Sequence, residues 1–137
     1  MSKSVTAPVL LISDTVWERR ATEILAIAPN TQPIIYVGDE PVADDLLPTI
    51  DIAFFSSDVW PDRPRGLVIS ILKATHLKWM HTFSAGVDSP FFIDLIKKGV
   101  TLTNSSGAAA SPIAQTAILY MLALSRNVRA WFEHQDN

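Results

Sequence analysis

Short apolar runs alternate with longer segments of helical periodicity along the 137-residue chain. The short runs have the length of buried strands, and they predict five strands, over residues 8–12, 33–38, 51–55, 77–83 and 100–103. The segments between them predict helices over residues 15–29, 67–74 and 90–98 and a short helical turn over residues 42–47. Strands and helices that alternate in this way form a parallel sheet with helices on both faces. The pattern therefore predicts an α/β fold, a flavodoxin-like domain with a parallel five-stranded sheet.

The last helical segment has a different pattern, and it predicts one long apolar helix over Ser111–Phe132. Ser111 can cap this helix, and Pro112 suits the first helical position because no hydrogen-bond partner is needed there. From Ile113 to Leu124 the segment is apolar nearly all round, which is typical of a helix buried on every face. A sheet covers only one side of a helix, so another domain or another chain would cover the rest. The alternative is an ordinary amphipathic helix with additional leucines.

Composition narrows the classes of function. Eleven Lys and Arg residues against 14 Asp and Glu residues give a net charge of −3, which argues against a nucleic-acid or anionic-membrane surface. The absence of cysteine excludes disulfides, thiolate metal sites and thiol nucleophiles, and it is compatible with a cytoplasmic location. The longest apolar stretch is shorter than the ~20 residues that span a bilayer, so no membrane partner is expected.

Two glycine-bearing loops follow predicted strands at the edge of the sheet where ligands bind in open α/β folds. Ser84–Asp88 follows the fourth strand, and its small residues would let backbone N–H groups approach an anion such as a carboxylate. Asn104–Gly107 follows the fifth strand and could present hydroxyls and amides to a ligand. Each loop could equally be a plain turn.

Other candidates are weaker. Trp60 could line a pocket or cover the sheet edge, and Arg63 and Arg65 could attract an acidic substrate or lie solvated at the surface. Asp14 and Asp39 have the position of helix-entry residues. The three histidines, 76, 81 and 134, have no metal-ligand spacing, so no metal site is predicted. The chain has no G-x-G-x-x-G, P-loop, G-x-S-x-G or H-E-x-x-H motif.

Several short motifs occur in a characteristic order between residues 77 and 126. They are Leu77-Lys78-Trp79-Met80, Ser84-Ala85-Gly86-Val87-Asp88, Gly99-Val100-Thr101-Leu102-Thr103-Asn104, Pro112-Ile113-Ala114 and Leu122-Ala123-Leu124-Ser125-Arg126. In this order and spacing they resemble the D-isomer-specific 2-hydroxyacid dehydrogenase family, with the loop closest to its glyoxylate/hydroxypyruvate reductase-like members. The resemblance covers roughly the last third of the chain. One departure is Gln115, where the family has a glutamate.

The resemblance implies a two-domain enzyme in which this chain is the N-terminal part. Residues 1–110 would form the substrate-binding domain, and residues 111–137 would form the first helix leading into an NAD(P)-binding domain that this sequence does not contain. The substrate carboxylate would be held by the backbone amides of Ala85, Gly86 and Val87, with Ser84 beside them. The catalytic residues and the NAD or NADP site would lie further along, so we expect no catalytic residue and no bound cofactor in this chain. The helix Ser111–Phe132 would form a homodimer.

The resemblance thus predicts a fragment of an oxidoreductase that transfers a hydride between NAD(P)H and a small 2-keto or 2-hydroxy acid, and that is inactive alone. The alternative is a non-catalytic interaction or regulatory module on the same scaffold. A receiver-like signalling domain is a poor fit, because Asp58 is displaced into a loop and Asn104 follows the fifth strand, where a lysine would be needed.

Overall fold

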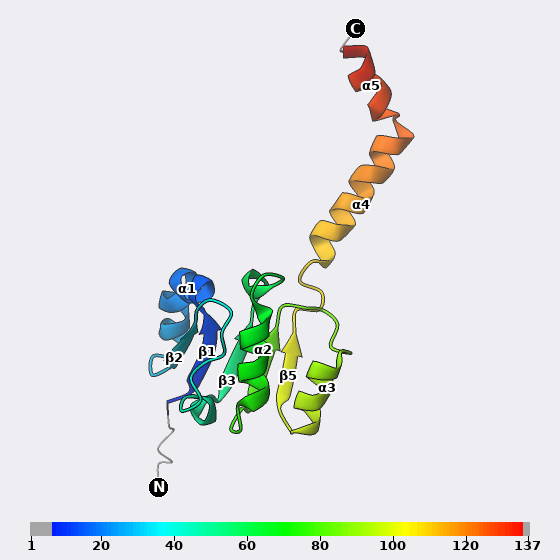
Figure 1. The fold of residues 1–137 in the computed structure, drawn as a ribbon. Coiled ribbons are helices and arrows are strands. Elements are labelled where there is room, and N and C mark those ends of the chain that lie inside the picture. Colours follow the sequence, from blue (N-terminus) through cyan, green and yellow to red (C-terminus); the bar gives the residue numbers. More distant parts are fainter. Residues whose placement is uncertain (1–6, 136–137) are drawn as a thin grey trace. The chain divides into compact units, whose positions relative to one another are not determined.

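The computed structural model describes residues 7–135, and the chain divides into two compact units at Ser105 and Ser106. The first unit contains a five-stranded sheet (Figure 1). Its strands are β1 (Val9–Ser13), β2 (Gln32–Tyr36), β3 (Ile52–Phe55), β4 (Trp79–Thr82) and β5 (Thr101–Asn104). All neighbouring strands are parallel, in the order β2-β1-β3-β4-β5, which is the flavodoxin-like order. The predicted parallel five-stranded sheet is confirmed.

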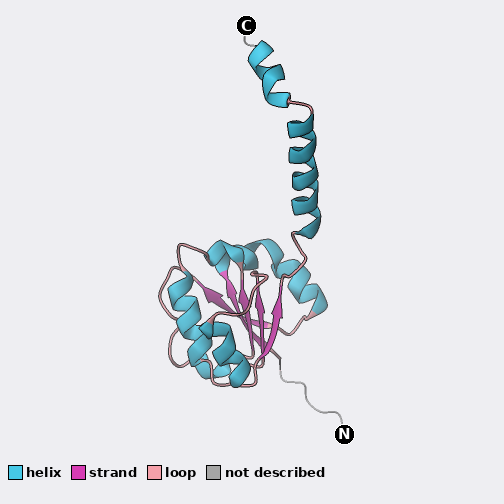
Figure 2. Ribbon diagram, turned by 90° about the vertical axis from the view of Figure 1, so that its right-hand side faces the viewer, coloured by secondary structure: helices cyan, strands magenta, loops and turns pink. Residues whose placement is uncertain are grey.

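Helices flank the sheet on both faces, as Figure 2 shows. They are α1 (Asp14–Ile27), α2 (Pro64–Lys73) and α3 (Pro90–Lys97), with short 3-10 turns η1 (Leu47–Thr49) and η2 (Ser57–Val59) in the connections. Ser13, the last residue of β1, caps α1 by accepting a hydrogen bond from the N–H of Val16. The strand therefore passes directly into the helix.

The face covered by α2 and α3 forms the core. Leu11, Ala53 and Met80 lie in register across β1, β3 and β4, and all three are fully buried. Leu67 of α2 and Leu95 of α3 belong to the same buried cluster. Burial of each large side chain of this kind stabilises the fold by about 1.5–3 kcal/mol.

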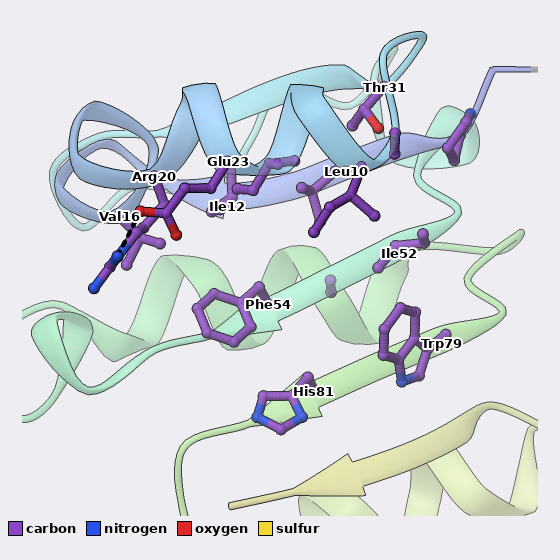
Figure 3. Close-up of a pocket in the computed structure, with 15 residues that line it drawn as sticks. Leu10, Ile12, Val16, Arg20, Glu23, Thr31, Ile52, Phe54, Trp79 and His81 are labelled. Atoms are coloured by element: carbon purple, nitrogen blue, oxygen red, sulfur yellow. Dashed lines mark hydrogen bonds and ion pairs between the residues drawn. The ribbon is translucent and has the colours of Figure 1, made fainter.

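The opposite face, against α1, is only partly covered. The rings of Phe54 and His81 stack with their centroids 5.4 Å apart, and Trp79 is 42% exposed on the same face. Figure 3 shows these three rings on β3 and β4. They line an apolar hollow of about 460 Å³ between α1 and strands β1, β3 and β4. None of the residues of α1 is fully buried.

The second unit contains two helices, α4 (Ala110–Ser125) and α5 (Val128–Gln135). The prediction of one long helix over Ser111–Phe132 is wrong in this respect. The break falls at Asn127, whose φ of 47° lies in the left-handed region, a conformation that asparagine tolerates better than most residues. Ser111 is also not the cap, because α4 begins one residue earlier and Ala109 holds the cap position.

The apolar side chains of α4 are exposed in this chain. Ile113 is 65% exposed, Met121 70% and Leu124 82%, and α4 has no buried residue. Among residues 7–135, no helix is both long and apolar enough to cross a bilayer.

Candidate functional site

The bend Ser84–Asp88 lies at the carboxyl edge of the sheet, just after β4. Its neighbours at this edge are the ends of β3 and β5, because β4 pairs with both strands in parallel. The second predicted loop begins at Asn104, the last residue of β5, and its first two residues, Asn104 and Ser105, lie beside the bend.

The carbonyl oxygens of this bend are bonded within the protein. The Ser84 carbonyl accepts from the backbone N–H of Ser105 at 3.3 Å, and the Ala85 carbonyl accepts from Nδ2 of Asn104 at 2.8 Å. The Gly86 carbonyl accepts from the Ser84 hydroxyl at 3.0 Å. Three successive acceptors are thereby satisfied.

Three successive N–H groups of the same bend have no hydrogen-bond partner among the residues that the structure describes. Within the described part of the chain, the amides of Ala85, Gly86 and Val87 donate no hydrogen bond. Ala85 and Gly86 are exposed, and Val87 is half-buried. The Ser84 N–H differs, because it donates to Oγ1 of Thr82 at 3.3 Å. The bend thus presents unpaired donors and no unpaired backbone acceptor over three peptides, which is the arrangement that suits an anion.

The hydroxyl of Ser84 braces the bend. It lies 3.0 Å from Oγ1 of Thr82 and donates to the Gly86 carbonyl, so Thr82 is the donor between the two hydroxyls. The resulting chain runs from the Ser84 N–H through both hydroxyls to Gly86. The family resemblance predicts that Ser84 lies beside amides that hold a carboxylate, and in the structure the N–H and the hydroxyl of Ser84 are bonded to the protein.

The carboxylate of Asp88 lies close to the bend. Its Oδ1 lies 3.2 Å from the position that a Cβ on Gly86 would occupy. Asp88 is exposed, and a carboxylate there opposes the binding of a second anion.

The start of the loop after β5 is hydrogen-bonded to β4 through His81. Nδ1 of His81 lies 2.9 Å from Oγ1 of Thr103, and Nε2 lies 3.2 Å from Oγ of Ser105. The Ser105 hydroxyl also lies 3.3 Å from the Thr82 carbonyl oxygen, so Ser105 contacts both the ring and the backbone of β4. With Trp79 Nε1 donating to Thr103, a continuous chain of hydrogen bonds crosses β4 and β5. This histidine therefore has a structural place in the sheet.

Arg63 lies in a cluster of charged side chains at the same edge of the sheet. Arg63 was named from the sequence, but this cluster was not predicted. Its guanidinium donates to both carboxylate oxygens of Asp14 and to Oδ2 of Asp58, and it lies 5.9 Å from the ring centroid of Tyr36. The Tyr36 hydroxyl in turn donates to the Arg63 carbonyl at 2.8 Å. The hydrogen bond from Arg63 holds the pKa of Asp14 below its usual value. The cluster ties the ends of β1, β2 and β3 together, which gives Arg63 a structural role.

The remaining candidates lie apart from the bend or stay exposed. Trp60 is 58% exposed in the connection after η2, and Arg65 and Asp39 are exposed. No group of three or more histidine and carboxylate side chains that could hold a metal ion occurs within residues 7–135.

Comparisons with known proteins were made on the sequence and on the fold. No model of a protein family matches the sequence, and no curated protein matches it. The fold matches a structure titled NAD-dependent formate dehydrogenase from Staphylococcus aureus in complex with NAD, with a TM-score of 0.55 and 19% identity over 90% of this chain. It also matches D-mandelate dehydrogenase from Rhodotorula graminis, with a TM-score of 0.55 and 16% identity over 85% of this chain. A phosphoglycerate oxidoreductase from Rhizobium etli matches with a TM-score of 0.53 and 15% identity over 88%.

The chain has the fold of part of these oxidoreductases. It spans 39%, 36% and 37% of the lengths of the three proteins, respectively. At this level of identity, the likeness shows the fold alone.

Proposed function

We propose that this chain is the carboxylate-binding part of an oxidoreductase that transfers a hydride between NAD(P)H and a small 2-keto or 2-hydroxy acid. The observation that carries the proposal is the bend after β4, where the amides of Ala85, Gly86 and Val87 are unpaired and the carbonyls of Ser84, Ala85 and Gly86 are bonded within the chain. The dehydrogenase-like fold supports it, as does the order of motifs between residues 77 and 126. The glyoxylate/hydroxypyruvate type of substrate rests on that resemblance.

The chemistry of the bend is that of positioning. Neutral N–H donors that are fixed in the protein bind a carboxylate and orient the adjoining keto carbon, without a side chain that changes its protonation state. NAD or NADP would supply the hydride in the whole protein. This chain has no G-x-G-x-x-G turn to hold a dinucleotide, and we expect no catalytic residue in it. We expect no turnover by this chain alone.

Ligand-dependent unfolding of the chain tests the substrate class. A ligand that binds only the folded state raises the free energy of unfolding by about 1.4 kcal/mol when its concentration is about tenfold above Kd. Glyoxylate and oxamate should raise the unfolding temperature in a saturable way, whereas oxamide, the neutral analogue of oxamate, should not. Equal effects of oxamate and oxamide would contradict the proposal.

The Asp88→Asn variant sharpens this test. Removing the like charge beside the bend should tighten oxamate binding by about threefold, which is the size of an exposed charge effect. Asp94→Asn is the matched control, because Asp94 is an exposed carboxylate on α3. An equal response of both variants would show that only overall charge matters.

We also propose that the helix segment Ser111–Phe132 forms a homodimer contact. The exposed apolar residues of α4, with Trp131 and Phe132 of α5, support this proposal. Leu122→Glu should convert a concentration-dependent dimer to a monomer in sedimentation velocity. A wild-type chain that stays monomeric at high concentration would refute the proposal.

The domain assignment is part of the same proposal. Residues 1–110 would bind the substrate, and residues 111–137 would lead into an NAD(P)-binding domain. A cytoplasmic enzyme is supported only by the absence of cysteine. The exposed apolar face of α4 also favours a second candidate, a non-catalytic interaction module. The two differ in the oxamate experiment, because a module that only binds another protein needs no selectivity for a small anion.

A further inference from the structure

Each of the three unpaired N–H groups belongs to a peptide unit whose carbonyl oxygen is hydrogen-bonded within the protein. In a trans peptide, the N–H of one residue points opposite to the carbonyl of the residue before it. A protein donor that holds the carbonyl therefore also fixes the direction of the following N–H. The donors described above hold one carbonyl in each of the three peptides.

Each donor can be paired with the amide that it directs. The Ser105 N–H holds the Ser84 carbonyl and so directs the Ala85 N–H. Nδ2 of Asn104 holds the Ala85 carbonyl and so directs the Gly86 N–H. The Ser84 hydroxyl holds the Gly86 carbonyl and so directs the Val87 N–H.

We infer that Asn104 and Ser84 are positioning residues that make this bend selective for an anion. The inference rests on the proposed function, since it concerns the same site. Two of the three donors are side chains, so the sequence could change them without changing the fold of β5. Without the Asn104 amide, the peptide between Ala85 and Gly86 can rotate and present its carbonyl to a ligand. A carbonyl turned outward would repel a carboxylate.

The chemistry of Asn104 suits this role. A carbonyl accepts only from a donor, so the NH₂ group of Asn104, rather than its oxygen, must face Ala85. An aspartate at this position could not donate, and it would add a negative charge close to the bend. Asn104→Asp should therefore weaken oxamate binding more than Asn104→Ala does.

Residue-resolved ¹⁵N NMR titration with oxamate tests the inference. In Asn104→Ala, binding should weaken by about three- to tenfold, as expected when one anchoring hydrogen bond is lost. The shift of the Gly86 amide should shrink most, while the Ala85 and Val87 amides keep most of their response. In Ser84→Ala the Val87 amide should be the one affected, and Ser84→Thr, which keeps the hydroxyl, should restore it.

The outcomes separate this inference from the proposed function. If the wild-type chain does not bind oxamate, the proposed function fails first. If the wild type binds and Asn104→Ala binds equally well with an unchanged Gly86 response, the inference is overturned. A uniform loss at all three amides would overturn it as well, since that is the result of general damage to the loop. The amide temperature coefficient of Gly86, measured without ligand, gives a second readout that should change only in the Asn104 variants.

Discussion

The sheet unit and the helix pair are both rich in apolar residues, but they differ in what those residues contact. Leu11, Leu67 and Met80 in the sheet unit are fully buried, whereas Leu119 and Met121 of α4 are 61% and 70% exposed. An apolar pattern in the sequence therefore predicts which side chains need to be buried. It does not predict which element or partner buries them. In the sheet unit the covering elements lie within the first 105 residues. Within the second unit, α4 has no buried residue, so α5 does not supply such cover.

The largest expected difference between the two units is in how much an apolar-to-alanine substitution lowers the free energy of unfolding. Leu67→Ala removes a fully buried side chain and should lower the free energy of unfolding by about 2–5 kcal/mol. Leu119→Ala, the matched change in α4, should alter it by about 0.5 kcal/mol or less under monomeric conditions. Urea unfolding monitored by circular dichroism measures both. Comparable losses would mean that α4 is packed against a partner under those conditions.

Charge clusters give a second contrast, of smaller size. Arg63→Met leaves Asp14 and Asp58 without their cation in a partly buried position and should lower the free energy of unfolding by about 2 kcal/mol. Arg129→Met removes the exposed pair with Glu133 and should change it by about 0.5 kcal/mol or less. The same urea experiment compares the two variants, and a null effect of Arg63→Met would remove the structural role given to this arginine.

Acid unfolding should show the smallest of these effects, and it should come from the sheet unit. The pKa of Asp14 is lowered mainly by the hydrogen bond from Arg63, and the pKa of Asp51 is lowered mainly by the hydrogen bond from Lys78. A lowered pKa in the folded state stabilises the protein above the unfolded value near 3.8. The free energy of unfolding should thus stay level above about pH 5. It should fall as the pH drops below the unfolded pKa near 3.8 toward the lower pKa of the folded state. The slope should be shallower in Arg63→Met, and an unchanged slope would contradict the assignment.

Much of the sheet could be predicted from local pattern. The strand predicted over residues 8–12 is Val9–Ser13, and the strand predicted over residues 100–103 is Thr101–Asn104, because buried parallel strands read as short apolar runs. The start of α2 at Pro64 was missed, although a proline at the first helical position is a usual signal. The break at Asn127 was missed because a left-handed residue interrupts the helix without any glycine or proline.

The sequence predicted where the candidate site lies, but not the hydrogen bonds that hold it. The position of the Ser84–Asp88 bend could be predicted from glycine and small residues after a strand. Its anchoring by Asn104 could not, because that hydrogen bond joins residues 19 positions apart through strand register. The cluster around Arg63 was invisible for the same reason, since its bond to Asp14 spans 49 positions. Hydrogen bonds between distant segments follow from the topology, which a local pattern does not contain.

We propose above that the amides of Ala85, Gly86 and Val87 bind a small carboxylate. The most direct measurement is a titration of the ¹⁵N-labelled wild-type chain with oxamate, followed at each backbone amide. The account predicts that these three amides shift together with one saturable Kd, and that oxamide produces no such shift. Oxamate shifts that avoid the bend, or that oxamide reproduces, would contradict it.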